Sequence, residues 1–214
     1  MTLTTTEKQY GILEGQPKDR EAWNSRGKTL ANLGRYEEAI ASYDKALEIN
    51  PEYDVAWYNR GSALDDSGRY EEAIASYDKA LELQPEDDDT WNSKGIALKN
   101  LGRYGEAIAS YNKALEINPE NEYAWYNRGM ALDDLGRYEE AIASYDKALE
   151  FNPDNASAWY DRACCYALQN KAEQAIKSLL QAIELAPEEG RKMARTDSDF
   201  DSIRHDPRFQ ALLR

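Results

Sequence analysis

The protein has 214 residues, of which 42% are hydrophobic, and a formal net charge of −14. The hydrophobic content suffices for a continuous core, but charged residues interrupt it too often for a membrane span. An acidic chain repels the phosphate backbone, so nucleic acid is not a predicted partner. Residues 1–8 contain no long apolar run and therefore predict no secretory signal, and the only two cysteines are adjacent, so we expect a cytoplasmic location.

The chain begins with a weakly patterned leader, residues 1–19, whose first residues are polar. Within it, Pro17 lies 34 residues before Pro51 and is in step with later prolines. We therefore predict that residues 7–15 form a degenerate second helix, which covers the first full unit as a cap.

From residue 20 onward, one tryptophan and one proline recur every 34 residues. The tryptophans are Trp23, Trp57, Trp91, Trp125 and Trp159, and the prolines are Pro51, Pro85, Pro119, Pro153 and Pro187. A fixed period of this length is typical of an array of stacked structural repeats. It predicts five units, at residues 20–53, 54–87, 88–121, 122–155 and 156–187.

Each unit has the apolar spacing of two helices. In the first unit Trp23, Gly27 and Leu30 fall on one face of a helix. Gly34 supplies a stop, because glycine readily adopts the left-handed conformation that ends helices. The same spacing resumes at Tyr36 and continues until Pro51, which cannot continue a helix interior. Each unit is therefore predicted to be a helix, a tight turn and an antiparallel helix.

This pattern resembles the tetratricopeptide repeat, with small and aromatic residues at fixed positions. The first unit carries it as Trp23, Gly27, Ala39, Tyr43, Ala46 and Pro51. The resemblance covers residues 20–187 and implies an all-α fold, a right-handed solenoid of antiparallel helix pairs. It also implies a concave groove lined by the first helix of each pair, where members of the family mostly bind peptides or partner proteins.

The fifth unit departs from the pattern. Ala163 replaces the glycine, Asn170 stands where the fourth unit has Gly136, and Leu179 stands where that unit has Tyr145. Terminal repeats are commonly atypical, because they meet a cap or solvent instead of another repeat.

Residues 188–214 leave the period and are predicted to form a C-terminal cap. Asp197 is expected to cap a helix that carries Phe200 and Ile203. The pair at residues 206–207, Asp-Pro, is typical of a helix start and leads to Phe209. We expect these apolar side chains to lie over the exposed face of the fifth unit.

The geometry implied by the resemblance turns five positions of each first helix toward the groove and places a sixth at its edge. The predicted partner-binding residues are Tyr58, Asn59, Asp65, Asp66, Asn92, Ile96, Lys99, Tyr123, Tyr126, Asn127, Met130, Asp133, Asp134 and Tyr160.

Two acidic pairs, at residues 65–66 and 133–134, occupy the last turns of their predicted helices, where the helix dipole disfavours negative charge. One interpretation is structural: Lys99 lies between Asp65 and Asp133 in the same row and bridges both, with Arg69 and Arg137 close in sequence. The other is functional: the carboxylates await a basic side chain of a partner.

Four tyrosines, Tyr58, Tyr123, Tyr126 and Tyr160, are expected to face outward, whereas those at position twenty-four of the first four units belong to the core. Tyrosine suits binding surfaces because it offers a large contact area and a polar tip. The alternative is that each ring packs on the adjacent unit. We hypothesise that the groove takes an extended segment with Lys or Arg near the acidic pairs and an apolar anchor near Tyr126, Met130 and Tyr160.

One subgroup of the family binds a C-terminal carboxylate through a clamp of Lys and Arg. Only Asn59, or Asn127 in another frame, matches that clamp here, and Asn24, Asp89 and Ser93 stand where it needs basic residues. Binding to chaperone tails that end in an acidic motif is therefore not predicted.

The sequence offers little for catalysis. The only histidine, His205, stands beside Asp206 near a predicted helix start, and the single, periodic glycines form no phosphate-binding loop. We expect Cys165 to fill the core, with the alternative that Cys164 faces the groove as a reactive thiol. We predict no enzyme activity, no cofactor and no metal site.

The sequence thus predicts a non-catalytic scaffold or adaptor that binds a peptide or partner protein, is a monomer or weak homo-oligomer, and has no nucleic-acid or membrane partner. One alternative is a structural homo-oligomer, in which near-identical units stack end to end. Another is a thiol-dependent activity at Cys164.

Overall fold

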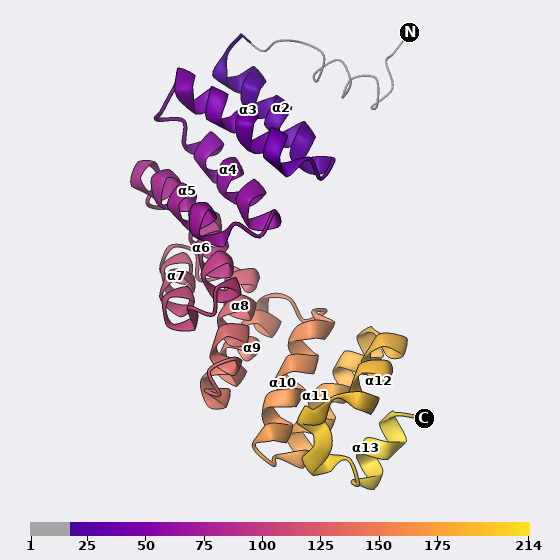
Figure 1. Ribbon diagram of the computed structural model, residues 1–214. Coiled ribbons are helices and arrows are strands. Elements are labelled where there is room, and N and C mark those ends of the chain that lie inside the picture. Colours follow the sequence, from indigo (N-terminus) through magenta and orange to yellow (C-terminus); the bar gives the residue numbers. More distant parts are fainter. Residues whose placement is uncertain (1–17) are drawn as a thin grey trace. The chain divides into compact units, whose positions relative to one another are not determined.

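The computed structural model describes residues 18–214, within which every regular element is helical (Figure 1). The predicted capping helix at residues 7–15 lies outside the described residues. The chain divides into two compact bodies, an N-terminal body that ends at Arg103 and a C-terminal body that begins at Tyr104.

The N-terminal body consists of consecutive helices that pack against their neighbours in sequence. The helices are α2 (Arg20–Asn32), α3 (Tyr36–Ile49), α4 (Asp54–Asp66), α5 (Tyr70–Leu83) and α6 (Asp88–Asn100). The first helices of successive repeats also touch, α2 with α4 and α4 with α6.

The C-terminal body continues the same arrangement and ends in a capping segment. Its elements are α7 (Tyr104–Ile117), α8 (Glu122–Asp133), α9 (Tyr138–Phe151), α10 (Ala156–Leu168), α11 (Ala172–Leu185), α12 (Pro187–Thr196), the 3-10 helix η1 (Ser198–Ile203) and α13 (Pro207–Leu212). The predicted all-α solenoid fold of helix pairs is confirmed. None of the helices between residues 18 and 214 combines the length and the apolar character needed to cross a bilayer.

Left-handed residues end the first helix of each pair. Gly34 has a φ of 72° and Gly136 one of 70°, which glycine adopts without steric cost. In the fifth repeat Asn170 takes the same conformation, with a φ of 59°, and asparagine is among the few other residues that tolerate it. The predicted stop at Gly34 is confirmed.

Close contact between a glycine and a tyrosine holds each typical helix pair together. A Cβ added to Gly61 on α4 would lie 2.6 Å from the Tyr77 ring on α5, and Gly129 meets Tyr145 in the same way. Tyr77 is buried, as its predicted core role requires. In the fifth pair, Ala163 stands in place of the glycine and the buried Leu179 in place of the tyrosine. A larger residue on the first helix is therefore matched by a smaller one on the second.

Polar contacts repeat along the junctions between repeats. The indole of Trp159 donates to the Pro153 carbonyl at 2.8 Å. Arg162 lies over the Trp159 ring at 4.2 Å and pairs with Asp146 on the second helix of the preceding repeat. Arg60, Lys94 and Arg128 occupy the equivalent place in their repeats.

The capping segment matches the sequence prediction in part. Asp197 caps η1, Asp206 caps α13 by accepting from the Arg208 amide at 2.9 Å, and Phe200 and Phe209 are fully buried against the fifth repeat. Helix α12 was not predicted. Proline at the first position of a helix is favourable, and Pro187 takes that position in α12.

We predict that Gly61→Ala lowers the free energy of unfolding by about 1–3 kcal/mol, because the new methyl group overpacks against Tyr77. Adding Tyr77→Leu to Gly61→Ala should recover part of that loss, since the fifth repeat combines alanine with leucine. Urea unfolding of both single variants and the double variant measures the coupling between the two sites.

The chain provides its own control for this cycle. Ala163→Gly should lose only about 0.5–1 kcal/mol, through greater backbone freedom, because Leu179 leaves room for either residue. If Gly61→Ala were as stable as the unaltered protein, the contact with the tyrosine ring would not limit the approach of the two helices.

Candidate partner-binding surface

Within each body, hydrogen bonds link the first helices of neighbouring repeats. We call the surface formed by these helices, α2, α4 and α6 in the N-terminal body and α8 and α10 in the C-terminal body, the first-helix face of that body. Position five of one repeat bonds to position six of the next: Asn24 accepts from the Asn59 amide at 2.9 Å, and Tyr126 donates to Asp161 at 2.8 Å. These bonds fix the register of the side chains between repeats one and two and between repeats four and five.

The capping segment continues this series of bonds. Tyr160, at position five of the last repeat, donates to Asp197 at 2.9 Å, and the Phe200 ring packs edge-on against it at a centroid distance of 5.7 Å. Tyr160 is consequently only 5% exposed. The expectation that Tyr160 faces outward is wrong, because the chain's own C-terminal segment occupies the place of a sixth repeat.

Predicted groove residues of the N-terminal body line two shallow hollows. Tyr58 is half-buried against Tyr77, with ring centroids 6.0 Å apart, and borders a hollow of about 100 Å³. Asn59 and Asp66 border another of about 150 Å³, together with Lys28. Both hollows are smaller than the one found in the C-terminal body.

The acidic pair at the end of α4 lacks the predicted bridge. Burial and the neighbouring Asp66 raise the pKa of Asp65 to about 6, and a hydrogen bond with Asn100 opposes the shift. Among residues 18–103, Lys99 forms no ion pair with Asp65, and Arg69 instead binds Glu72 at 2.6 Å. The predicted bridge by Lys99 is therefore wrong for this pair, and one oxygen of Asp65 is buried without a hydrogen-bond partner.

The other predicted groove residues differ in exposure. Tyr123 is 64% exposed, and Asp134 is also exposed. The half-buried ones are Asn92, Ile96, Lys99, Tyr126, Asn127, Met130 and Asp133.

The C-terminal body contains a hollow of about 250 Å³, which we call the α8–α12 pocket. Its lining comprises Tyr126, Met130, Ala156, Ser157, Tyr160, Asp161, Ala182, Ala186, Glu189, Gly190 and Met193. Three of these residues, Tyr126, Met130 and Tyr160, are those that the sequence suggested as an anchor site. The wall supplied by α12 was not predicted.

Carboxylates gather beside this pocket. Burial raises the pKa of Asp161 to about 6, and Asp133, Asp197 and Asp199 add to the shift, while the hydrogen bond from Tyr126 opposes it. Burial also raises the pKa of Asp133 and of Asp199. The C-terminal body therefore holds a concentration of negative charge that its own basic residues do not offset at Asp161.

The pair at residues 133–134 likewise lacks its expected arginine. Arg137 binds Glu140 at 2.7 Å, whereas Asp133 lies beside the Cys165 thiol, which lowers the pKa of Asp133 against the effect of burial. The predicted offset by Arg137 is therefore wrong.

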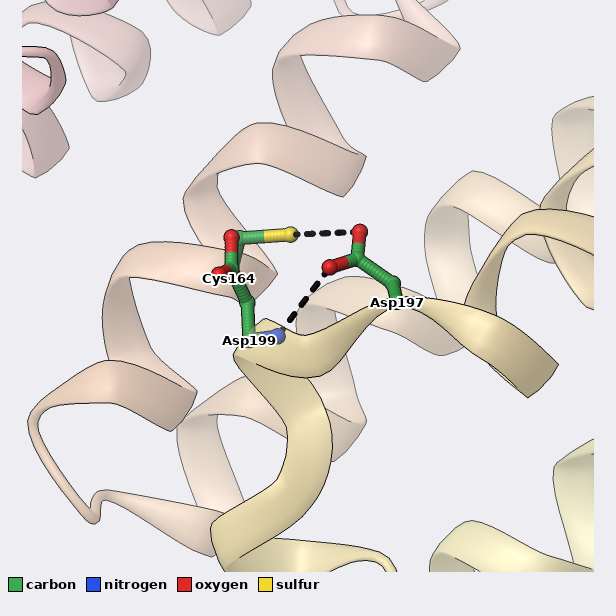
Figure 2. Close-up of side chains that lie close together, drawn as sticks. All are labelled: Cys164, Asp197 and Asp199. Carbon is green, nitrogen blue, oxygen red and sulfur yellow. Dashed lines mark hydrogen bonds between the residues drawn. The ribbon is translucent and has the colours of Figure 1, made fainter.

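The two cysteines are buried. Figure 2 shows the Cys164 thiol pointing at Asp197, to which it donates at 3.8 Å, while the Asp199 amide donates to the other oxygen of Asp197 at 3.0 Å. Cys164 is 5% exposed, and burial raises the pKa of its thiol, which stays protonated. The alternative of a groove-facing, reactive Cys164 is wrong, whereas Cys165 fills the core as predicted.

Cys164, Asp197 and Asp199 bring one possible ligand atom each to within 4.8 Å of one another. Metals bind cysteine as the thiolate, which the raised pKa of Cys164 disfavours. Asp197 already accepts bonds from Tyr160 and from the backbone as the cap of η1. Helix capping and hydrogen bonding account for this cluster.

Family models described as tetratricopeptide repeat match residues 21–53, 55–87, 92–156 and 126–189. Together the matches cover most of the chain, and the protein belongs to the tetratricopeptide repeat family. The resemblance inferred from the tryptophan and proline period is thereby confirmed. No curated protein matches the chain.

Solved structures with the same fold include YrrB, described as a TPR protein with an unusual peptide-binding site. It is 28% identical, with a TM-score of 0.68, over 86% of this chain and 95% of that one. MamA from Desulfovibrio magneticus is 20% identical, with a TM-score of 0.74, over 86% and 100% of the two chains. A thermophilic TPR protein from Thermus thermophilus is 22% identical, with a TM-score of 0.64, over 84% and 98%.

Asp161 was missed by sequence reasoning, although a signal was present. It stands at position six, where the first four repeats have Ser25, Asn59, Ser93 and Asn127. A charged residue at a position that is otherwise neutral marks the repeat in which the pocket forms.

The raised pKa of Asp161 predicts how stability depends on pH. The folded protein holds this proton more tightly than the unfolded chain does, so the cost of ionising Asp161 grows as pH rises from 3.8 to about 6 and is complete above that range. Asp161→Asn, which can still accept from Tyr126, should therefore stabilise the protein by about 1–2 kcal/mol near neutral pH, and by less at about pH 5.

Urea unfolding of the variant and the unaltered protein at both pH values measures this difference. Asp154→Asn, in the exposed turn before α10, removes the same charge and should show no comparable gain. Equal effects of the two substitutions at both pH values would contradict a specific cost of ionising Asp161.

Proposed function

We propose that the protein is a non-catalytic interaction scaffold whose C-terminal body captures an extended segment of a partner protein on its first-helix face. The α8–α12 pocket is the observation that carries this proposal, because it gives one side chain of the partner a place to insert. Tyrosine and methionine, which line it, are enriched at protein interfaces.

Two further observations support the proposal. YrrB, whose structure is similar, is described as having a peptide-binding site, and we extend the same kind of ligand to this chain. Asp65 and Asp161 have raised pKa values caused by burial and by neighbouring acids, so basic residues of a partner would relieve an existing electrostatic cost.

We further propose that the protein acts as a monomer. The capping segment bonds to Tyr160 and covers the last repeat with Phe200, which removes the surface that an end-to-end neighbour would need. Light scattering should give a mass near 24.4 kDa that does not rise with protein concentration. A mass that increased steadily with concentration would favour the structural homo-oligomer instead.

Selection from a displayed library of random peptides tests the binding function. Peptides enriched on the immobilised protein should be rich in Lys or Arg and should compete with one another for one site. Met130→Glu should weaken their binding by more than about tenfold, because it puts a charge into the apolar wall.

Leu180→Ala on α11 is the matched control, since it shortens an exposed apolar side chain that does not line the pocket. Circular dichroism should show both variants folded. Enriched peptides that bound Met130→Glu as tightly as the unaltered protein would place the binding site elsewhere and refute the role of this face.

A further inference from the structure

The α8–α12 pocket joins apolar walls to hydrogen-bond acceptors. Met130 on α8, Met193 on α12, and Ala182 and Ala186 at and after the end of α11 form surfaces that suit an aliphatic chain. Asp161 and Glu189 also line it, and none of its described lining residues is basic. Such a pocket combines a place for methylene groups with a place for a positive charge.

The phenol groups of the pocket already use their protons in hydrogen bonds to carboxylates. Tyr126 donates to Asp161 at 2.8 Å and Tyr160 donates to Asp197 at 2.9 Å, and Ser157 lies beside the Tyr126 hydroxyl. Because both phenol protons are already engaged, the walls present lone pairs to an incoming group. A ligand must therefore supply donors, which disfavours carboxylates and phosphates.

Helix α12 makes this pocket unlike the corresponding hollow of the second repeat. There, Gln84 occupies the position of Ala186, and the hollow measures about 100 Å³. In the last repeat Gly190 lets α12 approach α11, since a Cβ at Gly190 would lie 3.1 Å from Ile183. The pocket is thus formed by the end of the array.

We propose that the α8–α12 pocket binds the side chain of a lysine in the partner segment, with the methylene groups against the methionines and the ammonium on Asp161. The inference rests on the proposed function and names the residue that the scaffold recognises. Lysine fits because its stem is apolar and its head supplies three donors and no acceptor.

Charge supports this choice of occupant. Asp161 is flanked by Asp133, Asp197 and Asp199. The other titratable groups near it are the hydroxyls of Tyr126, Tyr145 and Tyr160 and the thiols of Cys164 and Cys165, and none of them is basic. An ammonium bound here would favour the ionised carboxylate, so binding should release a proton and strengthen as pH rises through about 6.

Methionine methyl groups provide a direct test by nuclear magnetic resonance. The chain has three methionines: Met130 and Met193 line the pocket, and Met1 serves as the internal reference. The probes are the Nα-acetyl, N-methylamide derivatives of lysine, Nε-acetyl-lysine and norleucine, which share a four-carbon stem and differ in charge.

The lysine derivative should shift the Met130 and Met193 signals and leave the Met1 signal unchanged. Norleucine and acetyl-lysine derivatives should bind about tenfold more weakly, a loss between those typical of exposed and buried charge pairs. Asp161→Asn should reduce lysine binding by a similar factor, Glu189→Gln by less, and the exposed control Asp154→Asn not at all.

Equal binding of the lysine and norleucine derivatives, or unchanged lysine binding by Asp161→Asn, would overturn the lysine site. Peptides from the library that bind the first-helix face but tolerate replacement of every lysine by norleucine would also overturn it, while the proposed scaffold function would stand. Lysine binding at the two methionines without capture of any peptide would instead support the site and refute the scaffold.

Discussion

The packing of a tyrosine ring against a bare glycine backbone is the contact on which the helix pairs depend. At Gly27, Gly61 and Gly129 the ring of the second helix lies where a Cβ would otherwise be. This contact fixes how closely two helices approach and uses the side of the first helix that faces its partner. The opposite side is free to vary, which is why near-identical repeats can present different residues on the first-helix face.

The fold of the repeats could be predicted because the sequence repeats its pattern. Tryptophan and proline recur in all five units and glycine and tyrosine in the first four, so a single departure, such as Asn170 for Gly136, can be interpreted against four other copies. The capping segment has no such copies. The burial of Tyr160 and the start of α12 at Pro187 therefore could not be predicted, because a proline in step with helix ends begins a helix there.

The acidic pairs show a second limit of prediction from the sequence. Assigning Lys99 and Asp65 to one row predicted an ion pair between them, but adjacent side chains on a helix differ in direction by about 100°. The neighbouring Asn100, and not Lys99, acts on the pKa of Asp65. The partner of a charge depends on this local geometry, which spacing alone does not specify.

In the C-terminal body, the carboxylates that are costly to ionise lie in the same place as the proposed binding site. Asp133, Asp161 and Asp199 all have raised pKa values where α10, α8 and the capping segment meet. Net repulsion of this kind is tolerated when the surrounding apolar packing is strong, and Phe200 and Phe209, both fully buried, supply such packing. A surface with excess negative charge close to a rigid core is well suited to hold a cation without changing shape.

The hydrogen bond between Tyr160 and Asp197 also limits which numbers of repeats such a chain can have. The capping segment needs a tyrosine at position five of the repeat before it, and repeats two, four and five have one, whereas repeats one and three have Asn24 and Asn92. Loss of the fifth repeat alone would leave Tyr126 to receive the cap, but loss of the last two would leave a shorter asparagine. After duplication or deletion of repeats, the capping segment can thus bond to the last repeat for some numbers of repeats and not for others.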